Sequence, residues 1–467
     1  MDRTLHRTVA AVCLAACLAL AAPAAASTVP GGMLGMNDWT QPSEATLSSV
    51  AHAGESRWRS PLFWYMVEKD RGVRNWSEYD GLVAAAARQH VSLLFVVAGC
   101  PYWACSDLTG PPTGSDAISA QQSFVRAAVA RYGTGGSFWG EHPELPRQPV
   151  TDWQVWNEVN SREFWKPGPN AADYARFLRG DAAAIRSTDP HATVVLSGLT
   201  EYGQVSISDY MHQLYAQPGF KSSFDVLALH AYAPDAPAVG RLLDRAKRVL
   251  DENGDGGRRI WVTEMGWGTS TPGLRTPTSE SEQADRLRQS YDMMIGCRSR
   301  WGLDRIYWFA YRDFTPPAGQ TDNAGYHTGL FRLDGSAKPA WSALQDYRAG
   351  AGFPGGCGEA STAAARAPQT HIRGKRRFRG TRRARLRLVS SVRGAHFQCR
   401  LVRARSHRPA RWHRCRARYR TPRLRRGRYK LLVRAIGADG KVDRSPARAR
   451  IRVRRGRRLS IMVRVLR

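Results

Sequence analysis

The sequence predicts an α/β fold, a (β/α)8 TIM barrel, followed by a small all-β domain. Between Gly31 and Asp313, short β-branched or aromatic runs alternate with longer Ala-, Arg- and Leu-rich segments of helical period, the pattern of βα units around a parallel sheet. The 467-residue chain holds eight such runs, as many as a barrel of this kind requires. In segments such as Ala384–Val389, Tyr429–Arg434 and Ala449–Val453, apolar residues alternate with arginine at period two, which is typical of half-buried strands.

The strand candidates are Gly32–Met36, Arg57–Phe63, Ser92–Ala98, Trp153–Trp156, Thr193–Ser197, Val226–His230, Ile260–Thr263 and Ile306–Phe309. The helices between them include Tyr79–Gln89, Ser119–Tyr132, Ala171–Ser187, Val239–Asn253 and Ser281–Cys297. A doubly wound open sheet would show the same alternation, and periodicity does not separate the two folds. Polar residues at the C-terminal ends of several strands favour the barrel, because its loops share one face.

The N-terminal 26 residues have the pattern of a secretory signal peptide. A short basic opening precedes an apolar run from Val9 to Ala22, and cleavage is expected after Ala26. The run is shorter than the roughly 18 to 20 apolar residues of a membrane span, and Pro23 ends it. The mature chain is therefore expected to be secreted. Lipoprotein processing at Cys17, which would tether it to the cell surface, is the second interpretation.

Charge divides the mature chain into two domains. Residues 359–467 contain 37 Lys and Arg against 3 Asp and Glu, or +34, so the first 358 residues carry −3 of the total of +31. A stretch rich in Ala, Thr, Ser and Pro at residues 358–371 is typical of a linker. We therefore expect a barrel domain at residues 27–357 and a basic β-domain at residues 372–467.

Six cysteines remain after signal cleavage, and export makes disulfides the first interpretation. They form three local pairs: Cys100 with Cys105, Cys297 with Cys357, and Cys399 with Cys415. A Cys297–Cys357 bridge would fasten the end of the barrel domain to its body. No pair has histidines at zinc-like spacing, so no structural metal is expected.

Two glutamates stand at the ends of predicted strands. The strand that begins at Trp153 ends in Asn157 and Glu158, and the strand that begins at Ile260 ends in Glu264. Hydrolysis of a glycosidic bond needs two carboxyl groups, one protonated to donate to the leaving oxygen and one ionised to attack or to activate water. These are the fourth and seventh predicted strands, so both carboxyl groups are expected at one mouth of the barrel.

At these residues the sequence resembles glycoside hydrolase clan A, whose members carry an Asn-Glu acid/base at strand four and a Glu nucleophile at strand seven. The resemblance covers about residues 31–347. It rests further on Arg59 with Trp64 and Glu68, Pro101-Tyr102-Trp103, Asp225 to Tyr232 with its His-x-Tyr end, Trp308, and Gly329 to Trp341. Within the clan the chain is most similar to the families of β-xylosidases, cellulases and secreted exopolysaccharide hydrolases.

The resemblance implies a retaining β-glycoside hydrolase that works by double displacement, with Glu158 as general acid/base and Glu264 as nucleophile. Asn157 would bind the sugar 2-hydroxyl. Arg59 would keep Glu264 ionised, and Tyr232 would donate to the same carboxylate. Partial burial and the charge of Glu264 would hold Glu158 protonated.

Other residues of the predicted site have supporting roles. His230 is expected to be a hydrogen-bonding partner and not an acid or base. Trp103, Trp267 and Trp308 offer apolar faces for sugar rings, although core positions are an equal alternative for the first two. The sequence departs from the clan at Val159, where a proline is usual, and this bears on substrate placement more than on catalysis. No cofactor is expected.

The C-terminal domain resembles bacterial extracellular immunoglobulin-like repeats over about residues 372–453. The resemblance rests on a Phe-x-Cys strand at Phe397, a second Cys at 415, a Gly-x-Tyr strand at Gly427 and a Val-Arg-Ala strand at Val433. It implies a β-sandwich with a Cys399–Cys415 bridge and no catalytic role.

A domain this basic binds polyanions in general. Export argues against nucleic acid and favours an anionic cell-wall polymer, such as teichoic acid or a uronate-containing polysaccharide, or anionic lipid headgroups. The alternative is a solvated face with no specific partner. Two interpretations of the whole chain compete with the hydrolase: a non-catalytic carbohydrate-binding or wall-associated protein on a hydrolase-like barrel, and a basic adhesin. Loss of either glutamate would favour the first of these, and both glutamates are present.

Overall fold

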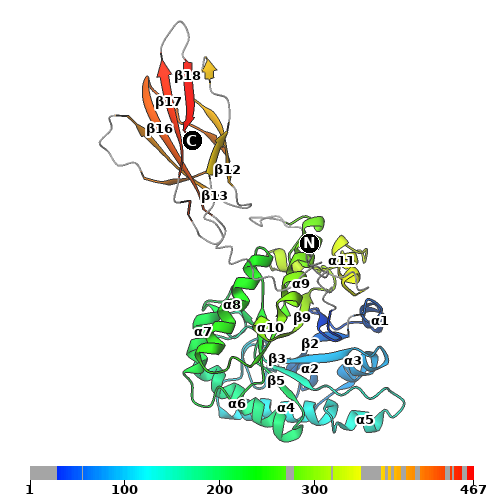
Figure 1. Cartoon of the computed structure of the whole chain (residues 1–467). Helices are drawn as coiled ribbons and strands as arrows, with labels where there is room; N and C mark the ends of the chain where they lie inside the picture. Colours follow the sequence, from blue (N-terminus) through cyan, green and yellow to red (C-terminus); the bar gives the residue numbers. More distant parts are fainter. Residues whose placement is uncertain are drawn as a thin grey trace, which may run out of the picture. The chain divides into compact units, whose positions relative to one another are not determined.

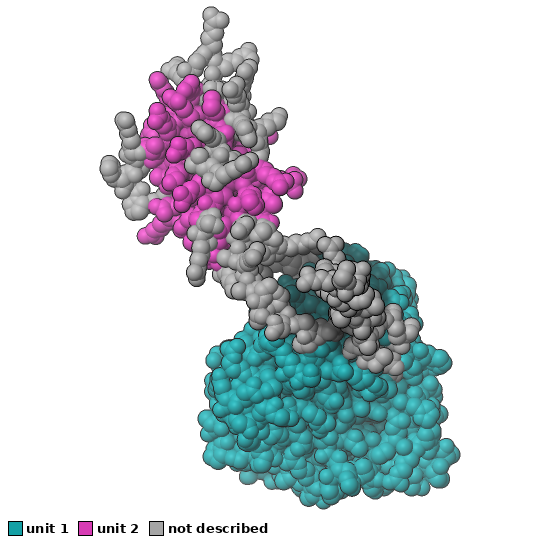
Figure 2. All heavy atoms as spheres, in the orientation of Figure 1, with its two compact units in different colours: residues 1–357 teal, residues 358–467 magenta. Residues whose placement is uncertain are grey.

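The computed structural model describes residues 29–54, 56–269, 278–316, 319–348 and 370–466, the last range with gaps at 374–376, 380–382, 391–395, 405–410, 437–441, 444–445 and 455–459. It divides into two compact units, residues 1–357 and 358–467 (Figure 2). The expected signal peptide, Cys17, Cys357 and most of the expected linker lie outside the described residues. Among the described residues, no helix is long and apolar enough to cross a membrane.

The first unit is a closed parallel barrel (Figure 1). Its ring runs β1–β2–β3–β4–β5–β7–β8–β9 and closes from β9 to β1. The strands are β1 Leu34–Asn37, β2 Arg57–Phe63, β3 Ser92–Ala98, β4 Asp152–Val155, β5 Thr193–Val195, β7 Val226–His230, β8 Arg259–Glu264 and β9 Leu303–Phe309. A short β6, Leu199–Thr200, follows β5 and pairs with β7. The predicted barrel is confirmed, and each of the eight expected strands overlaps one of its strands.

Helices surround the barrel. They are α1 Glu44–His52, α2 Trp64–Val67, α3 Ser77–Arg88, α4 Ser115–Tyr132, α5 Ser137–Glu141, α6 Ala171–Thr188, α7 Ile207–Tyr215, α8 Ala236–Glu252, α9 Glu280–Gly296, α10 Arg298–Trp301 and α11 Pro339–Arg348, with a 3-10 turn at Ala324–His327. Local chemistry fixes several starts: Asn170 caps α6, Asp235 caps α8, and Ser279 forms a capping box with Glu282 at α9. These caps satisfy amides that the first helical turn leaves without partners.

Two layers of apolar side chains hold the barrel together. The larger cluster joins the helices to the outside of the strands. A separate cluster comes from five strands: Leu94, Val195, Val226, Ala228, Trp261 and Tyr307. Side chains from so many strands meet only inside the ring, so the interior is a packed core and not a pore. Polar chemistry is thereby confined to the ends of the barrel.

The second unit is a small antiparallel β-sandwich. A three-stranded sheet has the order β10–β12–β15, and a six-stranded sheet has the order β11–β18–β17–β16–β13–β14. The strands are β10 Thr370–Arg373, β11 Arg377–Arg379, β12 Arg385–Ser390, β13 His396–Arg403, β14 His413–Cys415, β15 Arg418–Arg420, β16 Gly427–Ile436, β17 Ala447–Arg454 and β18 Ser460–Leu466. One apolar cluster takes Leu386 and Tyr419 from the first sheet and Leu431 and Ile451 from the second, so the two sheets share a core.

Two of the three expected disulfides are present. Cys100 is bonded to Cys105, and Cys399 to Cys415. The Cys297–Cys357 pair stays a prediction, because Cys357 lies outside the described residues.

The Cys399–Cys415 bond should stabilise the sandwich and not the barrel. It closes a segment with a sequence separation of 16, and a loop of this size is worth about 3 kcal/mol through the entropy of the unfolded chain. In the full chain with Cys399→Ser and Cys415→Ser, we expect calorimetry to show a lower unfolding temperature for the sandwich and an unchanged unfolding temperature for the barrel. A barrel transition that falls as well would contradict this assignment, and Met462→Leu in β18 serves as the control.

Candidate active site

The two predicted catalytic glutamates meet at the C-terminal mouth of the barrel. Glu264 is the last residue of β8, and Glu158 follows the end of β4. A carboxylate oxygen of each, together with a ring nitrogen of His230, lies within 4.8 Å of the other two. Residues far apart in sequence thus form one cluster, because parallel strands end on the same face.

The backbone is unusual where β4 ends. Trp156 and Glu158 have positive φ values of 67° and 39°, a region that residues with a side chain rarely occupy. Such conformations persist where the surroundings over-determine them, and they gather at active sites. Here the Trp156 ring nitrogen donates to the Phe164 carbonyl at 2.7 Å, and the Glu158 amide donates to the Gly198 carbonyl at 3.1 Å. These contacts aim Glu158 across the mouth.

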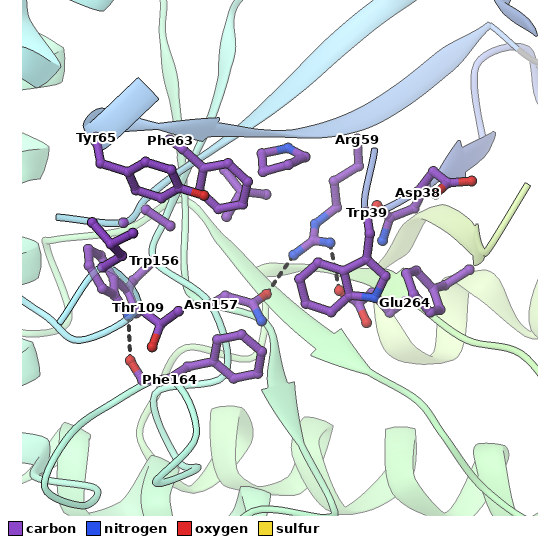
Figure 3. Close-up of a pocket in the computed structure, with 17 residues that line it drawn as sticks. Asp38, Trp39, Arg59, Phe63, Tyr65, Thr109, Trp156, Asn157, Phe164 and Glu264 are labelled. Atoms are coloured by element: carbon purple, nitrogen blue, oxygen red, sulfur yellow. Dashed lines mark hydrogen bonds and ion pairs between the residues drawn. The ribbon is translucent and has the colours of Figure 1, made fainter. Parts of the chain in front are cut away.

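Arg59 organises the charged half of the site (Figure 3). From β2 it donates to three side chains: Glu264 Oε1 at 2.7 Å, Asn157 Oδ1 at 2.8 Å and Gln154 Oε1 at 3.0 Å. The Arg59 and Glu264 side chains are only 6% and 7% exposed, so their charges neutralise each other largely out of water. The Tyr232 hydroxyl donates to the other Glu264 oxygen at 2.8 Å. Both expected contacts to Glu264 are therefore present.

Glu158 has the opposite environment. Burial is the main cause that raises its pKa to about 8, and the negative charge of Glu163 adds to the effect. The second contribution therefore comes from Glu163 in the following loop, where we expected it from Glu264. At neutral pH Glu158 is mostly protonated while the carboxylate of Glu264 is paired with Arg59. The site holds one acid and one anion.

His230 lies between the two carboxyl groups. Its Nδ1 is 2.6 Å from Glu158 Oε1 and 3.4 Å from Glu264 Oε2. Complete burial lowers the pKa of His230 to about 3, so the ring is neutral and bridges the pair without adding a charge. Its Nε2 faces Gly198, where a Cβ atom would lie 2.0 Å from that nitrogen. Only glycine fits there, and the histidine ring is thereby fixed.

Glu158, His230 and Glu264 are also the one group of potential metal ligands found among the described residues. The Arg59 guanidinium already occupies Glu264 Oε1. A cation bound by all three residues would face that positive charge, so the donor set suits proton transfer better than metal binding.

A cavity of about 120 Å³ opens beside Arg59, Asn157 and Glu264. Most of its wall is aromatic or aliphatic: Trp39, Pro61, Phe63, Tyr65, Val96, Ala98, Leu108, Trp156, Phe164 and Phe309. Glu158 and His230 do not line it. Aromatic walls with a few fixed polar groups are typical of sites for small organic ligands.

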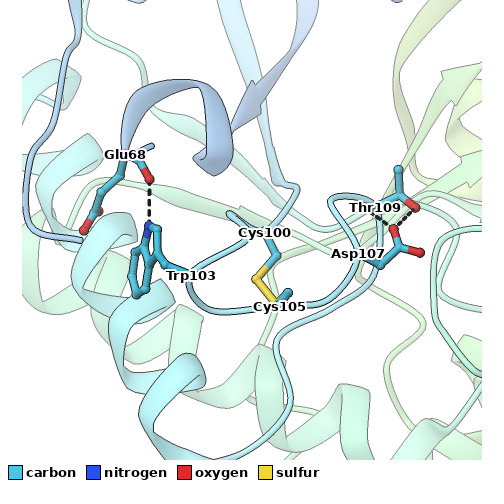
Figure 4. Close-up of a disulfide and its surroundings, with 6 residues drawn as sticks. All are labelled: Glu68, Cys100, Trp103, Cys105, Asp107 and Thr109. Carbon is cyan, nitrogen blue, oxygen red and sulfur yellow. Dashed lines mark hydrogen bonds between the residues drawn. A yellow bond between two sulfur atoms is a disulfide. The ribbon is translucent and has the colours of Figure 1, made fainter. Parts of the chain in front are cut away.

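Trp308, expected under the sugar, and Trp103 and Trp267, expected either under the sugar or in the core, do not line this cavity. Trp308 is fully buried, donates to the Thr328 carbonyl at 3.0 Å and packs beside Trp267. Trp267 is 6% exposed and donates to the Ala233 carbonyl. These two are core residues. Trp103 lies in the loop closed by the Cys100–Cys105 bond, where it donates to the Glu68 carbonyl at 2.9 Å (Figure 4).

Other aromatic residues take their place. Phe309, one position after Trp308, lines the cavity, and Trp39 is 42% exposed beside it, stacked on Phe164 with ring centroids 6.2 Å apart. Tyr202, 73% exposed, lies 6.4 Å from the Tyr232 ring. The sequence does carry a signal for Trp39, since it follows the first strand in Asn-Asp-Trp at the mouth where barrel sites form.

At the level of sequence, the chain has little similarity to known proteins. No protein-family model matches the chain. A β-xylosidase of Geobacillus stearothermophilus is 30% identical over 92 residues, so the match spans 19% of this chain and only 18% of that enzyme.

Solved structures share the fold over greater lengths. The family 39 glycoside hydrolase of Xanthomonas axonopodis pv. citri has a TM-score of 0.53 at 15% identity, covering 94% of this chain and 95% of that one. The family 39 enzyme of Bacteroides cellulosilyticus WH2 has a TM-score of 0.52 at 17% identity, covering 93% and 81%. The first unit thus has the (β/α)8 fold found in glycoside hydrolases of family 39.

Proposed function

We propose that the chain is a secreted, retaining β-glycoside hydrolase. The observation that carries the proposal is the contrast between two adjacent carboxyl groups: burial raises the pKa of Glu158 to about 8, while Arg59 and Tyr232 hold Glu264 by ionic hydrogen bonds. Pairs of carboxyl groups with divergent environments are how one site supplies an acid and an anion at one pH. The resemblance to clan A and the shared fold with family 39 enzymes support the same conclusion.

The separation of the carboxyl groups favours retention. Oxygens of Glu158 and Glu264 approach within 4.8 Å, whereas inverting enzymes hold their two carboxyl groups about 6.5–9.5 Å apart to admit a water. Direct attack by Glu264 fits this shorter distance.

Each residue then has a defined task. A Glu264 oxygen attacks the anomeric carbon while the Glu158 proton moves to the leaving oxygen, so one glycosidic bond breaks and one glycosyl ester forms. Glu158, now ionised, takes a proton from water as that water attacks the same carbon and releases Glu264. Arg59 fixes Asn157 Oδ1, which leaves the amide nitrogen to meet the sugar 2-hydroxyl.

The substrate that fits best is a β-linked polysaccharide or oligosaccharide. Trp39 and Tyr202 are large aromatic side chains left exposed near the acidic pair, and aromatic faces bind the C–H faces of pyranose rings. Secretion is proposed from the N-terminal pattern of residues 1–26. The basic second unit is proposed to bind an anionic polymer of the cell wall or its surroundings.

The pH dependence of activity should follow Glu158. Because its protonated form is the acid, and its pKa is about 8, kcat/KM for a β-glycoside with a poor leaving group should fall about tenfold per pH unit above pH 8. Glu163→Gln removes a charge that raises this pKa and should move the alkaline limb to lower pH. Glu252→Gln, at the exposed end of α8, should leave the limb in place, and an unmoved limb in Glu163→Gln would contradict the assignment.

The two glutamates should fail differently when replaced. Glu264→Ala removes the nucleophile, so activity should approach background with every leaving group. Glu158→Ala removes proton transfer only, so an activated aryl glycoside should still form the glycosyl-enzyme, and azide should release it as the β-glycosyl azide. Azide rescue of Glu264→Ala should give the α-azide. The reverse pattern would exchange the two roles, and full activity in both variants would reject the site.

The stereochemistry of the first product should show net retention, because two displacements at one carbon restore its configuration. Proton NMR of an early time point with an aryl β-glycoside should show the β-anomer before mutarotation. Early α-anomer would place a water between the carboxyl groups and overturn the double displacement.

A further inference from the structure

The six-stranded sheet of the second unit has two faces of opposite character. Along β17, buried Ala449, Ile451 and Val453 alternate with exposed arginines. The same alternation runs along β16, where Leu431 and Val433 are buried. One face therefore forms the core of the sandwich, and the other presents its side chains to solvent.

Strand register arranges the solvent face in three rows. Across β13, β16, β17 and β18, the rows read Arg400–Leu432–Arg448, Val402–Lys430–Arg450 and Arg428–Arg452–Met462. We call these nine residues the basic face. Among these nine residues each row has two cations and one apolar residue, and in β18 the first two rows continue with Leu466 and Arg464. Successive rows lie about 6.8 Å apart because they are two residues apart along each strand.

No carboxylate in the described part of the chain neutralises the basic face. Among the described residues, none of its six cations forms an ion pair: Arg400, Arg428, Lys430, Arg448, Arg450 and Arg452. Arg428 stands directly opposite Arg452, and Lys430 opposite Arg450, and like charges in such positions destabilise a sheet. The positive charge of Arg454, partial desolvation and the positive charge of Arg428 all lower the pKa of Arg452.

The charges also surround a hollow. Arg426, Arg428, Arg452 and Arg454 line a cleft of about 290 Å³ where β16 begins and β17 ends. Guanidinium groups that converge without a partner carboxylate offer paired N–H donors to an incoming oxyanion. Folding alone gives no reason for this arrangement, whereas an anionic ligand does.

The apolar member of each row narrows the choice of ligand. Met462 is 42% exposed beside Arg452. Leu432 is half-buried between Arg400 and Arg448, and Val402 is half-buried at the end of its row beside Lys430. At the next row position, the Arg434 guanidinium lies 4.4 Å from the Trp412 ring centroid. A polymer that pairs carboxylates with hydrocarbon ring faces satisfies both kinds of side chain, whereas a flexible phosphodiester chain uses the charges alone.

We propose that the basic face binds a uronic-acid polysaccharide, with carboxylates on the arginines and the C–H faces of the sugar rings over Leu432, Val402 and Met462. The choice of a polysaccharide rests on the proposed function of the barrel, while the requirement for an anionic polymer does not. Binding would hold the tethered barrel at a high local concentration of carbohydrate.

The test is retention of the full chain on immobilised polygalacturonate, with Glu264→Gln in every variant so that binding is measured without turnover. Arg428→Glu, Arg450→Glu and Arg452→Glu together should weaken binding at least about tenfold, and each lost contact should lower the salt slope by roughly 0.7–0.9. Arg385→Glu, Arg387→Glu and Arg418→Glu, exposed on β12 and β15, change the net charge equally and should bind nearly as wild type.

Equal losses in the two triple variants would show binding by net charge and overturn the site. Leu432→Ser with Met462→Ser should weaken binding to polygalacturonate and leave binding to poly(glycerol phosphate) unchanged. Tighter binding of poly(glycerol phosphate) or single-stranded DNA than of polygalacturonate would overturn the proposed class of partner.

Far-UV circular dichroism checks the folding of each variant. If the charge reversal unfolds the sandwich, Arg→Gln at positions 428, 450 and 452 replaces it. Failure of turnover by the chain without Glu264→Gln would reject the barrel's function and leave the binding result intact.

Discussion

The ion pair between Arg59 and Glu264 is the interaction on which the site depends. Both side chains are nearly buried, and a buried charge without its partner is strongly destabilising. Arg59 also ties Gln154 and Asn157 to the same guanidinium, so one side chain on β2 fixes the ends of β4 and β8. Planar geometry makes arginine suited to this task, because a lysine ammonium could not hold three acceptors in one plane.

Around that ion pair, two carboxyl groups of the same residue type have different environments. Glu158 and Glu264 differ in what surrounds them: desolvation and a nearby anion in one case, a guanidinium and a phenol in the other. Neutral His230 touches both and so couples their orientations without shifting the balance of charge. The backbone at Trp156 and Glu158 has positive φ values, and the hydrogen bond from the Trp156 ring to the Phe164 carbonyl helps to hold this conformation and with it the position of Glu158.

The two units handle charge in opposite ways. In the barrel, the charges of Arg59 and Glu264 at the mouth are paired and largely buried. In the sandwich, arginines stand opposite arginines on an exposed sheet, and the core beneath is apolar. A buried ion pair acts over a short distance at the mouth, whereas unpaired exposed charges create a field that reaches outward and is screened by salt.

Periodicity in the sequence predicts eight βα units in order, and the polar residues at several strand ends favour a barrel over an open sheet. Strand and helix periods differ, and parallel strands end on one face of a barrel. Sequence pattern and the clan A motifs therefore group Arg59, Asn157, Glu158, His230, Tyr232 and Glu264. Period-two alternation predicts the strands of the second unit, and local spacing predicts the two cysteine pairs. The sandwich itself is implied by the resemblance to immunoglobulin-like repeats.

Which aromatic residues face the ligand depends instead on packing in three dimensions. Trp308 and Phe309 are neighbours on β9, and side chains alternate between the two faces of a strand, so a shift of one residue exchanges core for cavity. Sequence pattern cannot set that phase when both residues are aromatic. The contribution of Glu163 to the raised pKa of Glu158 could not be predicted from the sequence either. Glu163 comes close to Glu158 only through the path of a loop, and loop paths depend on packing that no local period encodes.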